Sequence, residues 1–446
     1  MSEISRYFQV LGFTFAQAFT SALASMLFGY LGAMGLTAAS ASRKSRAALI
    51  ALALLPNTLP IIFVIFSFMK YLPLARGFVG IIIIHTMLNS GLAAIAIYQL
   101  LQNKIGSLAD LAYIENCSRT RFFFKVILPY LKNDLFRIFF FVFAICFTSF
   151  AVPLMIGGAS GTTIEVLIYE KIRVSADWTQ AFIMTLVEVI FILFVSLFVR
   201  RDVAKASQIS SRNPLLSLDF GIIVIVFPAA FVCFCLVQSS LEAKASLDFS
   251  TLALGSFFVA LGSGLLSLIL FFITARFRPA PRFRRLLLGL ATPSAVIVGF
   301  ALLILVHATG WASFFKLIIG LTFMHFPILY RLSWDAQIFS ISQQIETAKT
   351  IGASQSRIFS KIIAPQVLRS AYHLSGLAAL WAFSDFTLAS VVAEKDLTLA
   401  QLFSHLIETY RWEAAESLIL PMMAGSILCY ILFSGVGYVA SRRTLR

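Results

Sequence analysis

Charged residues are scarce in this chain: they make up 12% of its 446 residues, whereas an average soluble domain has about 25%. Apolar residues are correspondingly abundant, at 59%, and 45 residues are phenylalanine. One water-excluding core cannot hide so many apolar side chains, so the composition excludes an ordinary soluble protein. A lipid bilayer is the solvent that such a chain requires.

The chain also lacks the motifs of several protein classes. Four of its five cysteines lie within apolar runs, so they form no extracellular disulfide framework. No G-x-x-x-x-G-K-[ST] sequence is present to bind the phosphates of ATP, and neither H-E-x-x-H nor G-x-S-x-G indicates a hydrolase. The first apolar run is too long for a signal peptide. We therefore expect a protein that is not an enzyme and binds no cofactor itself.

Basic residues exceed acidic ones by 15 (35 Lys+Arg minus 20 Asp+Glu), a balance that could indicate a nucleic-acid partner. They cluster in short segments between apolar runs, however, and this placement argues for a membrane protein and against nucleic-acid binding. Apolar stretches of about 20 residues predict eleven transmembrane helices. These lie near 8–38, 47–69, 77–101, 135–157, 180–200, 218–238, 251–275, 287–308, 314–338, 371–394 and 415–439.

The segments between the predicted helices alternate in charge. Basic residues follow the first, fifth and seventh apolar runs and end the chain, whereas the segments around 158–178, 239–250 and 395–413 are mixed or mildly acidic. Because positively charged segments stay in the cytoplasm, we expect a cytoplasmic C-terminus and an external N-terminus in a bacterial inner membrane. The odd count makes the N-terminal half look one helix short.

An internal repeat is the most informative feature. Residues 110–129 and 346–365 align without a gap, so that every position in the first segment has one counterpart in the second. The identical pairs include Ala112 with Ala348, Arg121 with Arg357, Phe123 with Phe359, Lys125 with Lys361, Ile127 with Ile363 and Pro129 with Pro365. These matches lie in polar segments, where chance similarity between Phe-rich helices is a poor explanation. Two related halves in one membrane chain indicate a pathway at the interface between repeats.

Each copy of the repeat predicts a short amphipathic helix, because its apolar residues fall on one helical face. The apolar positions are Phe122, Phe123, Val126 and Ile127 in the first copy and Ile358, Phe359, Ile362 and Ile363 in the second. Gly352 interrupts the second copy and predicts a turn or the close approach of a partner. An interfacial helix that rests on lipid head groups is the alternative interpretation.

The second copy resembles the cytoplasmic loop motif of binding-protein-dependent ABC importer permeases: E-A-A, three residues, G, nine residues, then I-x-L-P. The matching residues are Glu346, Ala348, Gly352, Ile362 and Pro365, with the spacing intact, whereas Thr347 replaces the first alanine and Ala364 replaces the leucine. The first copy is weaker: it keeps the spacing with Asp110, Ala112 and Pro129 but has Asn116 where the glycine is expected. Because asparagine also adopts left-handed backbone conformations, we expect this loop to keep its turn.

The resemblance covers nearly the whole chain and is to the fused, two-half permeases of the thiamine and ferric-iron branch. It implies an all-α polytopic membrane protein with the MetI-like permease fold, in two halves at residues 1–205 and 206–446. It also implies two copies of a cytoplasmic ABC ATPase, which bind ATP and Mg, and a periplasmic solute-binding protein. The positions implied for coupling to the ATPase are Asp110, Ala112, Asn116, Pro129, Glu346, Ala348, Gly352, Ala353 and Pro365.

The solute is a finer inference. The segment 147–172, with its Gly-Gly and Thr-Thr-x-Glu elements, resembles thiamine permeases, which implies thiamine or a thiamine phosphate as the small-molecule solute. Ferric ion and polyamines are alternatives, because their permeases share the architecture. An ion-coupled secondary transporter and a permease-like scaffold are alternatives from other classes, although a secondary transporter needs no pair of docking loops.

Asp385 is the ionisable residue that we single out within an apolar run. A carboxylate at that depth is costly unless it faces protein or water. We expect it to line the path of a cationic solute together with Ser384 and Ser149. The alternative is that it binds neighbouring hydroxyl groups or caps a broken helix.

Other polar or helix-breaking residues within apolar runs predict packing roles. Hydrogen bonds between helices explain His85 and His325 better than metal ligation does. Pro56, Pro60 and Pro293 are expected to break the second and eighth apolar runs, either as hinges for alternating access or as packing irregularities.

Overall fold

The computed structural model describes residues 3–39, 43–158, 161–196, 213–242, 249–277, 284, 287, 294–305, 311–393 and 397–444. Over these residues the chain is helical and contains no strand, which confirms the expected all-α fold. The chain divides into two compact units: residues 1–167 with 190–238, and residues 168–189 with 239–446. Each unit buries its own core.

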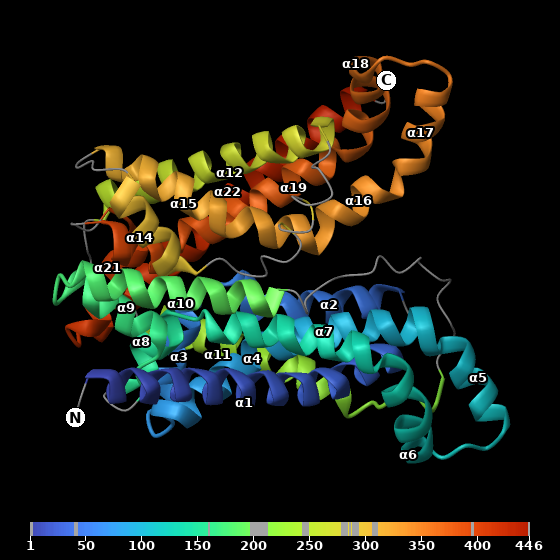
Figure 1. Cartoon of the computed structure of the whole chain (residues 1–446), viewed down its shortest axis with the longest axis horizontal. Helices are drawn as coiled ribbons and strands as arrows, with labels where there is room; N and C mark the ends of the chain where they lie inside the picture. The colour runs from blue at the N-terminus through green and yellow to red at the C-terminus, as the bar shows by residue number, and fades with distance from the viewer. Residues whose placement is uncertain are drawn as a thin grey trace. The chain divides into compact units, whose positions relative to one another are not determined.

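The first unit is a helical bundle with a protruding helix–turn–helix at one end (Figure 1). Its elements are α1 (Glu3–Ala38), α2 (Arg43–Thr58), α3 (Ile61–Tyr71), α4 (Gly77–Leu100), the π-helix η2 (Leu101–Ile105), α5 (Gly106–Ile114), α6 (Arg119–Phe122), the π-helix η3 (Phe123–Ile127), α7 (Leu128–Phe147), α8 (Ala151–Ile156) and most of α11 (Gly221–Glu242). Helices α9 (Ile164–Arg173) and α10 (Trp178–Ser196) contribute residues to both units.

The second unit repeats this arrangement, with α17 and α18 protruding at one end of its bundle (Figure 1). Its elements are α12 (Ser250–Phe277), α14 (Ala295–Leu305), α15 (Trp311–Leu329), the π-helix η5 (Tyr330–Trp334), α16 (Asp335–Ser340), α17 (Ser342–Thr350), α18 (Gln355–Ile358), the π-helix η6 (Phe359–Ile363), α19 (Ala364–Phe383), α20 (Thr387–Val392), α21 (Leu399–Glu408) and α22 (Trp412–Thr444).

The element bounds repeat with the alignment found in the sequence, in which residue 110 corresponds to residue 346. In that same alignment the first residue of α17 corresponds to the first residue of α5, and the first residue of α19 to that of α7. The pairs α6 and α18, η3 and η6, and α8 and α20 correspond at both ends. The predicted duplication is therefore confirmed at the level of secondary structure.

Seven helices among the described residues are long and apolar enough to cross a membrane, or eight if the bent pair α2 and α3 forms one span. The pair bends by 86° at Pro60, so the predicted break is confirmed there. Pro56 lies inside α2 and does not end the helix, so the break predicted at this residue is wrong. Three further predicted spans correspond to the shorter α14 and to α7 and α19, which carry polar residues in their first turns. Pro293 lies outside the described residues.

Helix α11 packs against α1 in the first unit. Their backbones touch where Gly35 meets Gly221, and a Cβ atom at either position would clash with the opposing helix. The amide of Leu218 also donates to the carbonyl of Met34 at 3.2 Å. Small residues at a helix crossing permit such close packing in a membrane protein. The boundary at 205/206 between two homologous halves stays a prediction.

Candidate functional site

The candidate site is a pair of helix–turn–helix segments, the first loop (residues 106–129) and the second loop (residues 342–365). In the first loop a turn joins α5 to α6, and η3 then leads into α7, whose first turn contains Pro129. In the second loop α17, α18, η6 and α19 follow in the same order, with Pro365 in the first turn of α19. Proline suits this position because a first-turn amide has no partner within the helix.

The turns of the two loops have the same backbone conformation. Asn116 has φ 55° and Gly352 has φ 78°, both in the left-handed region. In each loop the amide after the left-handed residue donates back to an alanine carbonyl: Cys117 to Ala112 at 2.9 Å, and Ala353 to Ala348 at 3.0 Å. The expectation that Asn116 preserves the turn is thus confirmed.

The turn, and not a crowded contact, explains the glycine at position 352. A Cβ atom added to Gly352 would meet no heavy atom of the described residues within 4 Å. The second helix of each loop is then capped by a serine, since Ser118 accepts from the amide of Arg121 and Ser354 from that of Arg357, both at 3.4 Å. The predicted turn is confirmed, whereas the close approach of a partner at Gly352 stays a prediction.

The predicted amphipathic face anchors each loop in the core of its unit. Phe122 and Ile127 are buried in the first loop, as are Ile358 and Ile363 in the second. The two members of each pair lie a π-helical turn apart, because η3 and η6 are π-helical and a wider turn places every fifth residue on one face. The polar residue Lys361 is exposed. The sequence predicted this face but not its π-helical geometry.

Each anchored face belongs to a larger apolar cluster that reaches into the bundle. The first cluster joins the first loop to α1, α4, α7 and α11, and the second joins the second loop to α12, α15 and α19. In the second cluster Trp334 is fully buried and donates its indole N–H to the Thr274 hydroxyl at 3.1 Å. A displacement of either loop would therefore also move the helices of its own unit against which the loop packs.

The outer surface of each loop exposes apolar side chains. Leu111, Tyr113 and Ile114 are exposed near the tip of the first loop, where Ile114 is 72% accessible. At the tip of the second loop Ile351 is 79% accessible. These residues lie beside charged groups in polar segments and not in the lipid-facing middle of a bundle. Exposed apolar residues in such a setting are typical of a protein-docking surface.

The linker segment (residues 213–220) holds the first loop. Asp110, predicted to contact an ATPase, is exposed and accepts a hydrogen bond from the Asn213 side-chain amide at 2.7 Å. The guanidinium of Arg119 donates to the carbonyls of Pro214 and Ser217 at 2.8 and 2.7 Å. The sequence reasoning missed these contacts, because nothing in the pattern of residues 213–220 indicates where the segment lies.

Different groups hold the second loop. Glu346, which corresponds to Asp110, pairs with Lys349 at 3.0 Å, and both side chains are exposed. Gln355, which corresponds to Arg119, donates to the carbonyl of Arg276 at 3.3 Å. At the base of the loop, Arg284 donates to both carboxylate oxygens of Asp335 at 2.6 and 2.9 Å. This bidentate bond raises the pKa of the Arg284 guanidinium above its ordinary value.

The predicted path residues lie where two helices break. Ser384 and Asp385 separate α19 from α20, and Ser149 lies at the corresponding break between α7 and α8. Asp385 accepts from the Thr387 hydroxyl at 2.8 Å and from the Leu388 amide at 3.0 Å. It therefore caps α20, as the alternative interpretation expected. The geometry neither requires nor removes a role in the solute path, which stays a prediction.

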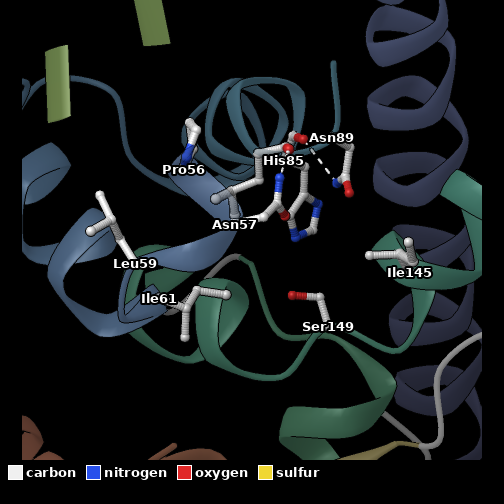
Figure 2. A pocket seen from close by; sticks show the side chains of 9 residues that line it. Pro56, Asn57, Leu59, Ile61, His85, Asn89, Ile145 and Ser149 are labelled. Carbon is white, nitrogen blue, oxygen red and sulfur yellow. Dashed lines mark hydrogen bonds between the residues drawn. The ribbon is translucent and has the colours of Figure 1, made fainter. Parts of the chain in front are cut away.

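Ser149 lines a cavity of about 120 Å³ in the first unit (Figure 2). The lining residues are Pro56, Asn57, Leu59, Ile61, His85, Leu88, Asn89, Ile145 and Ser149. The expected hydrogen bond from the His85 ring to another helix is absent among the described residues, so that prediction is wrong. The ring instead faces the cavity that the α2–α3 bend opens beside α4 (Figure 2). The sequence predicted the break at Pro60 but not the cavity that the bend opens beside His85.

A comparison with known families matches most of this chain. Residues 10–206 and 273–446 match the family described as "Binding-protein-dependent transport system inner membrane component". The two matched segments contain the first and the second loop, respectively.

Curated relatives share shorter stretches with the chain. It is 28% identical to the thiamine transport system permease protein ThiP of Escherichia coli (strain K12) over 218 residues, which cover 44% of this chain and 40% of that protein. It is 32% identical to the protein of the same name from Haemophilus influenzae over 139 residues, which cover 31% of this chain and 26% of the relative. The aligned stretches thus span less than half the length of these relatives.

Proposed function

The chain belongs to the family of binding-protein-dependent inner-membrane transport components, and from this membership we propose that it is the membrane-spanning permease of an ATP-driven importer. The observation that carries the proposal is the pair of matched loops. Each loop has the same left-handed turn, exposes apolar residues outward and is anchored in the core of its own unit. Two equivalent docking surfaces suit two copies of one partner.

In the proposed mechanism each loop docks on one copy of a cytoplasmic ABC ATPase. ATP hydrolysis on the partners moves the loops, and the rigid anchoring of Phe122 and Ile358 transmits this movement to the bundles. The two halves, residues 1–205 and 206–446, then open the path alternately outward and inward. A solute-binding protein delivers the solute from the periplasm. The chain lies in the bacterial inner membrane with a cytoplasmic C-terminus, an orientation supported by Arg442 and Arg443.

We assign thiamine or a thiamine phosphate as the solute. The support is the name of the relatives, which are thiamine transport system permease proteins. Ferric ion and polyamines are the comparison solutes in the test, because the permeases that carry them share this architecture.

The test is solute-dependent ATP hydrolysis. The chain is coexpressed with the ATPase and the binding protein encoded beside it, purified and placed in lipid. We expect thiamine to stimulate hydrolysis, and Gly352→Glu to abolish the stimulation because it places a charge on the tip of the second loop. Ferric ion and spermidine serve as comparison solutes.

The same experiment separates the proposal from an ion-coupled transporter. If no ATPase copurifies and the Gly352 variant behaves as wild type, the loops do not couple to an ATPase and the proposal fails. Stimulation by ferric ion or spermidine in place of thiamine retains the importer but overturns the assigned solute.

A further inference from the structure

We propose that the cavity between the α2–α3 bend and α4 is a binding subsite for a neutral nitrogen heteroaromatic ring, held by His85 and Ser149. The inference rests on the proposed import function, because the ring is taken to be part of the transported solute. Within a thiamine molecule this part is the aminopyrimidine, whereas the positively charged thiazolium ring does not enter the cavity.

His85 supplies the first observation. Its side chain is 2% accessible, and neither ring nitrogen has a hydrogen-bond partner among the residues that the structure describes. Leaving a buried polar group without a partner destabilises the protein. The imidazole and the Ser149 hydroxyl project into the same space (Figure 2). A ligand that bonds to the ring removes this cost when it enters.

The polar groups of the wall are already engaged in holding it together. The Asn57 side-chain amide donates to the carbonyl of Leu88 and ties the end of α2 to α4. The Asn89 amide donates to the carbonyl of His85 at 2.9 Å and to the Cys146 sulfur at 3.6 Å, which ties α4 to α7. These bonds fix the shape of the cavity and leave the imidazole and the hydroxyl to face a ligand.

The lining selects a neutral group. None of the nine lining residues is Asp, Glu, Lys or Arg, and an ionic group without a counter-charge is costly in such a setting. A neutral imidazole offers one N–H donor and one acceptor nitrogen. Because the two nitrogens of an imidazole point away from each other, one of them bonds to an aminopyrimidine through its ring-nitrogen acceptor or its amino donor, and the Ser149 hydroxyl bonds to the other group. Leu59, Ile61 and Ile145 contact the faces of the ring.

The volume limits the ligand to about one ring. The cavity of about 120 Å³ is well below the roughly 300 Å³ at which pockets for drug-sized ligands begin. The cavity is also larger than the volume of about 30 Å³ that one water molecule occupies in liquid water. A single six-membered ring with small substituents matches this size, whereas a whole two-ring solute does not.

The test measures binding of the isolated ring to the full chain in lipid nanodiscs. The probe is radiolabelled 4-amino-5-(hydroxymethyl)-2-methylpyrimidine, and the competitor is the positively charged 5-(2-hydroxyethyl)-3,4-dimethylthiazolium ion. We expect saturable pyrimidine binding that the thiazolium ion does not displace. His85→Phe should weaken binding at least tenfold, and Ser149→Ala should weaken it about threefold.

His325→Phe is the matched control. His325 is also a buried histidine, but it packs edge-on against Trp381 in the second unit and does not line this cavity. Binding should be unchanged in this variant. His85→Gln, which keeps a polar side chain, replaces His85→Phe if the phenylalanine variant does not give a monodisperse protein.

Three outcomes overturn the subsite: no saturable pyrimidine binding, equal binding to the His85 variants and wild type, or displacement by the thiazolium ion. Thiamine-stimulated ATP hydrolysis, measured on the same preparation with its partners, tests the import function separately. Stimulation without pyrimidine binding removes the subsite alone. Pyrimidine binding without stimulation by thiamine retains the subsite and removes the assigned solute.

Discussion

The first and second loops share one backbone but differ in what holds them. The first is bonded to the linker segment through Asp110 and Arg119, contacts between segments far apart in the chain. The second is held by Gln355, which donates to the carbonyl of Arg276, whereas the exposed pair of Glu346 and Lys349 lies within α17 itself. The difference shows that the common feature is the turn and its apolar anchor, whereas the polar contacts around it are specific to each loop.

The two helix breaks differ in a related way. In the second unit Asp385 uses its carboxylate to cap α20. In the first unit the corresponding residue is Ser149, whose hydroxyl faces a cavity. A duplicated backbone thus carries a charged cap in one copy and a polar cavity in the other, so the two units present different chemistry.

The largest effect is expected from a change that breaks the shared turn. Gly352→Val places a β-branched residue in the left-handed region, at a cost of about 1–2 kcal/mol. This lowers the population of the correct turn by about 5- to 30-fold. Solute-stimulated ATP hydrolysis should fall accordingly in the reconstituted complex.

Gly352→Asn is the matched control, because the first loop already contains asparagine in this conformation. It should retain most of the stimulation. Equal losses in the valine and asparagine variants would mean that the backbone conformation is not what the partner requires.

A smaller effect is expected at the second helix break. Asn caps helices about as well as Asp, whereas Ala costs about 1 kcal/mol. Asp385→Asn should therefore leave the thermal stability unchanged and lower thiamine uptake several-fold, because it removes the charge alone. Asp385→Ala should lower both. Uptake that is normal in the asparagine variant would remove Asp385 from the solute path and leave it the role of a cap.

Arg119→Ala is expected to release the linker segment without unfolding the chain. It removes two hydrogen bonds to carbonyls, each worth up to about 1.5–3 kcal/mol when buried and less at this exposed position. Hydrogen exchange of the amides at 213–220 should rise about tenfold. Gln355→Ala removes the corresponding single bond in the second loop and should change exchange near Arg276 much less. Exchange that rises equally in both places would contradict the stronger anchoring of the first loop.

The smallest effect on stability is expected from Glu346→Gln. The side chains of Glu346 and Lys349 are 60% and 54% accessible, and exposed pairs contribute about 0–1 kcal/mol. The melting temperature should therefore stay within about 2 °C of wild type. A fall in solute-stimulated ATP hydrolysis without a matching loss of stability would then show that Glu346 contributes to docking on the ATPase. A large loss of stability would show that the pair supports the fold of the second loop.

Much of the loop architecture could be predicted from the sequence. The ungapped repeat located both loops, and the identity of Asn116 and Gly352 predicted the left-handed turns. The apolar spacing identified the buried faces at Phe122 and Ile358. These features are local, since they depend on backbone preferences and on periodicity within about twenty residues.

The sequence did not predict the contacts that depend on long-range packing. Asn213 lies 103 residues from Asp110, and no local pattern relates the two. The role of His85 was misjudged for the same reason: the 86° bend of α2 and α3 opens a cavity beside it, and the ring gains no partner within the described part of the chain. Helix α11 illustrates the same limit, because its packing on α1 depends on the meeting of Gly35 and Gly221.

By itself the sequence determined that this chain is a duplicated helical membrane protein with two like loops, because apolar runs, repeat spacing and turn residues act through short-range physics. Only the tertiary structure decided which groups hold each loop, that Asp385 caps a helix and that Ser149 faces a cavity with His85. These outcomes depend on which side chains meet when helices far apart in the sequence pack together. Hydrogen-bond donors and acceptors are paired, or left unpaired, only at that stage.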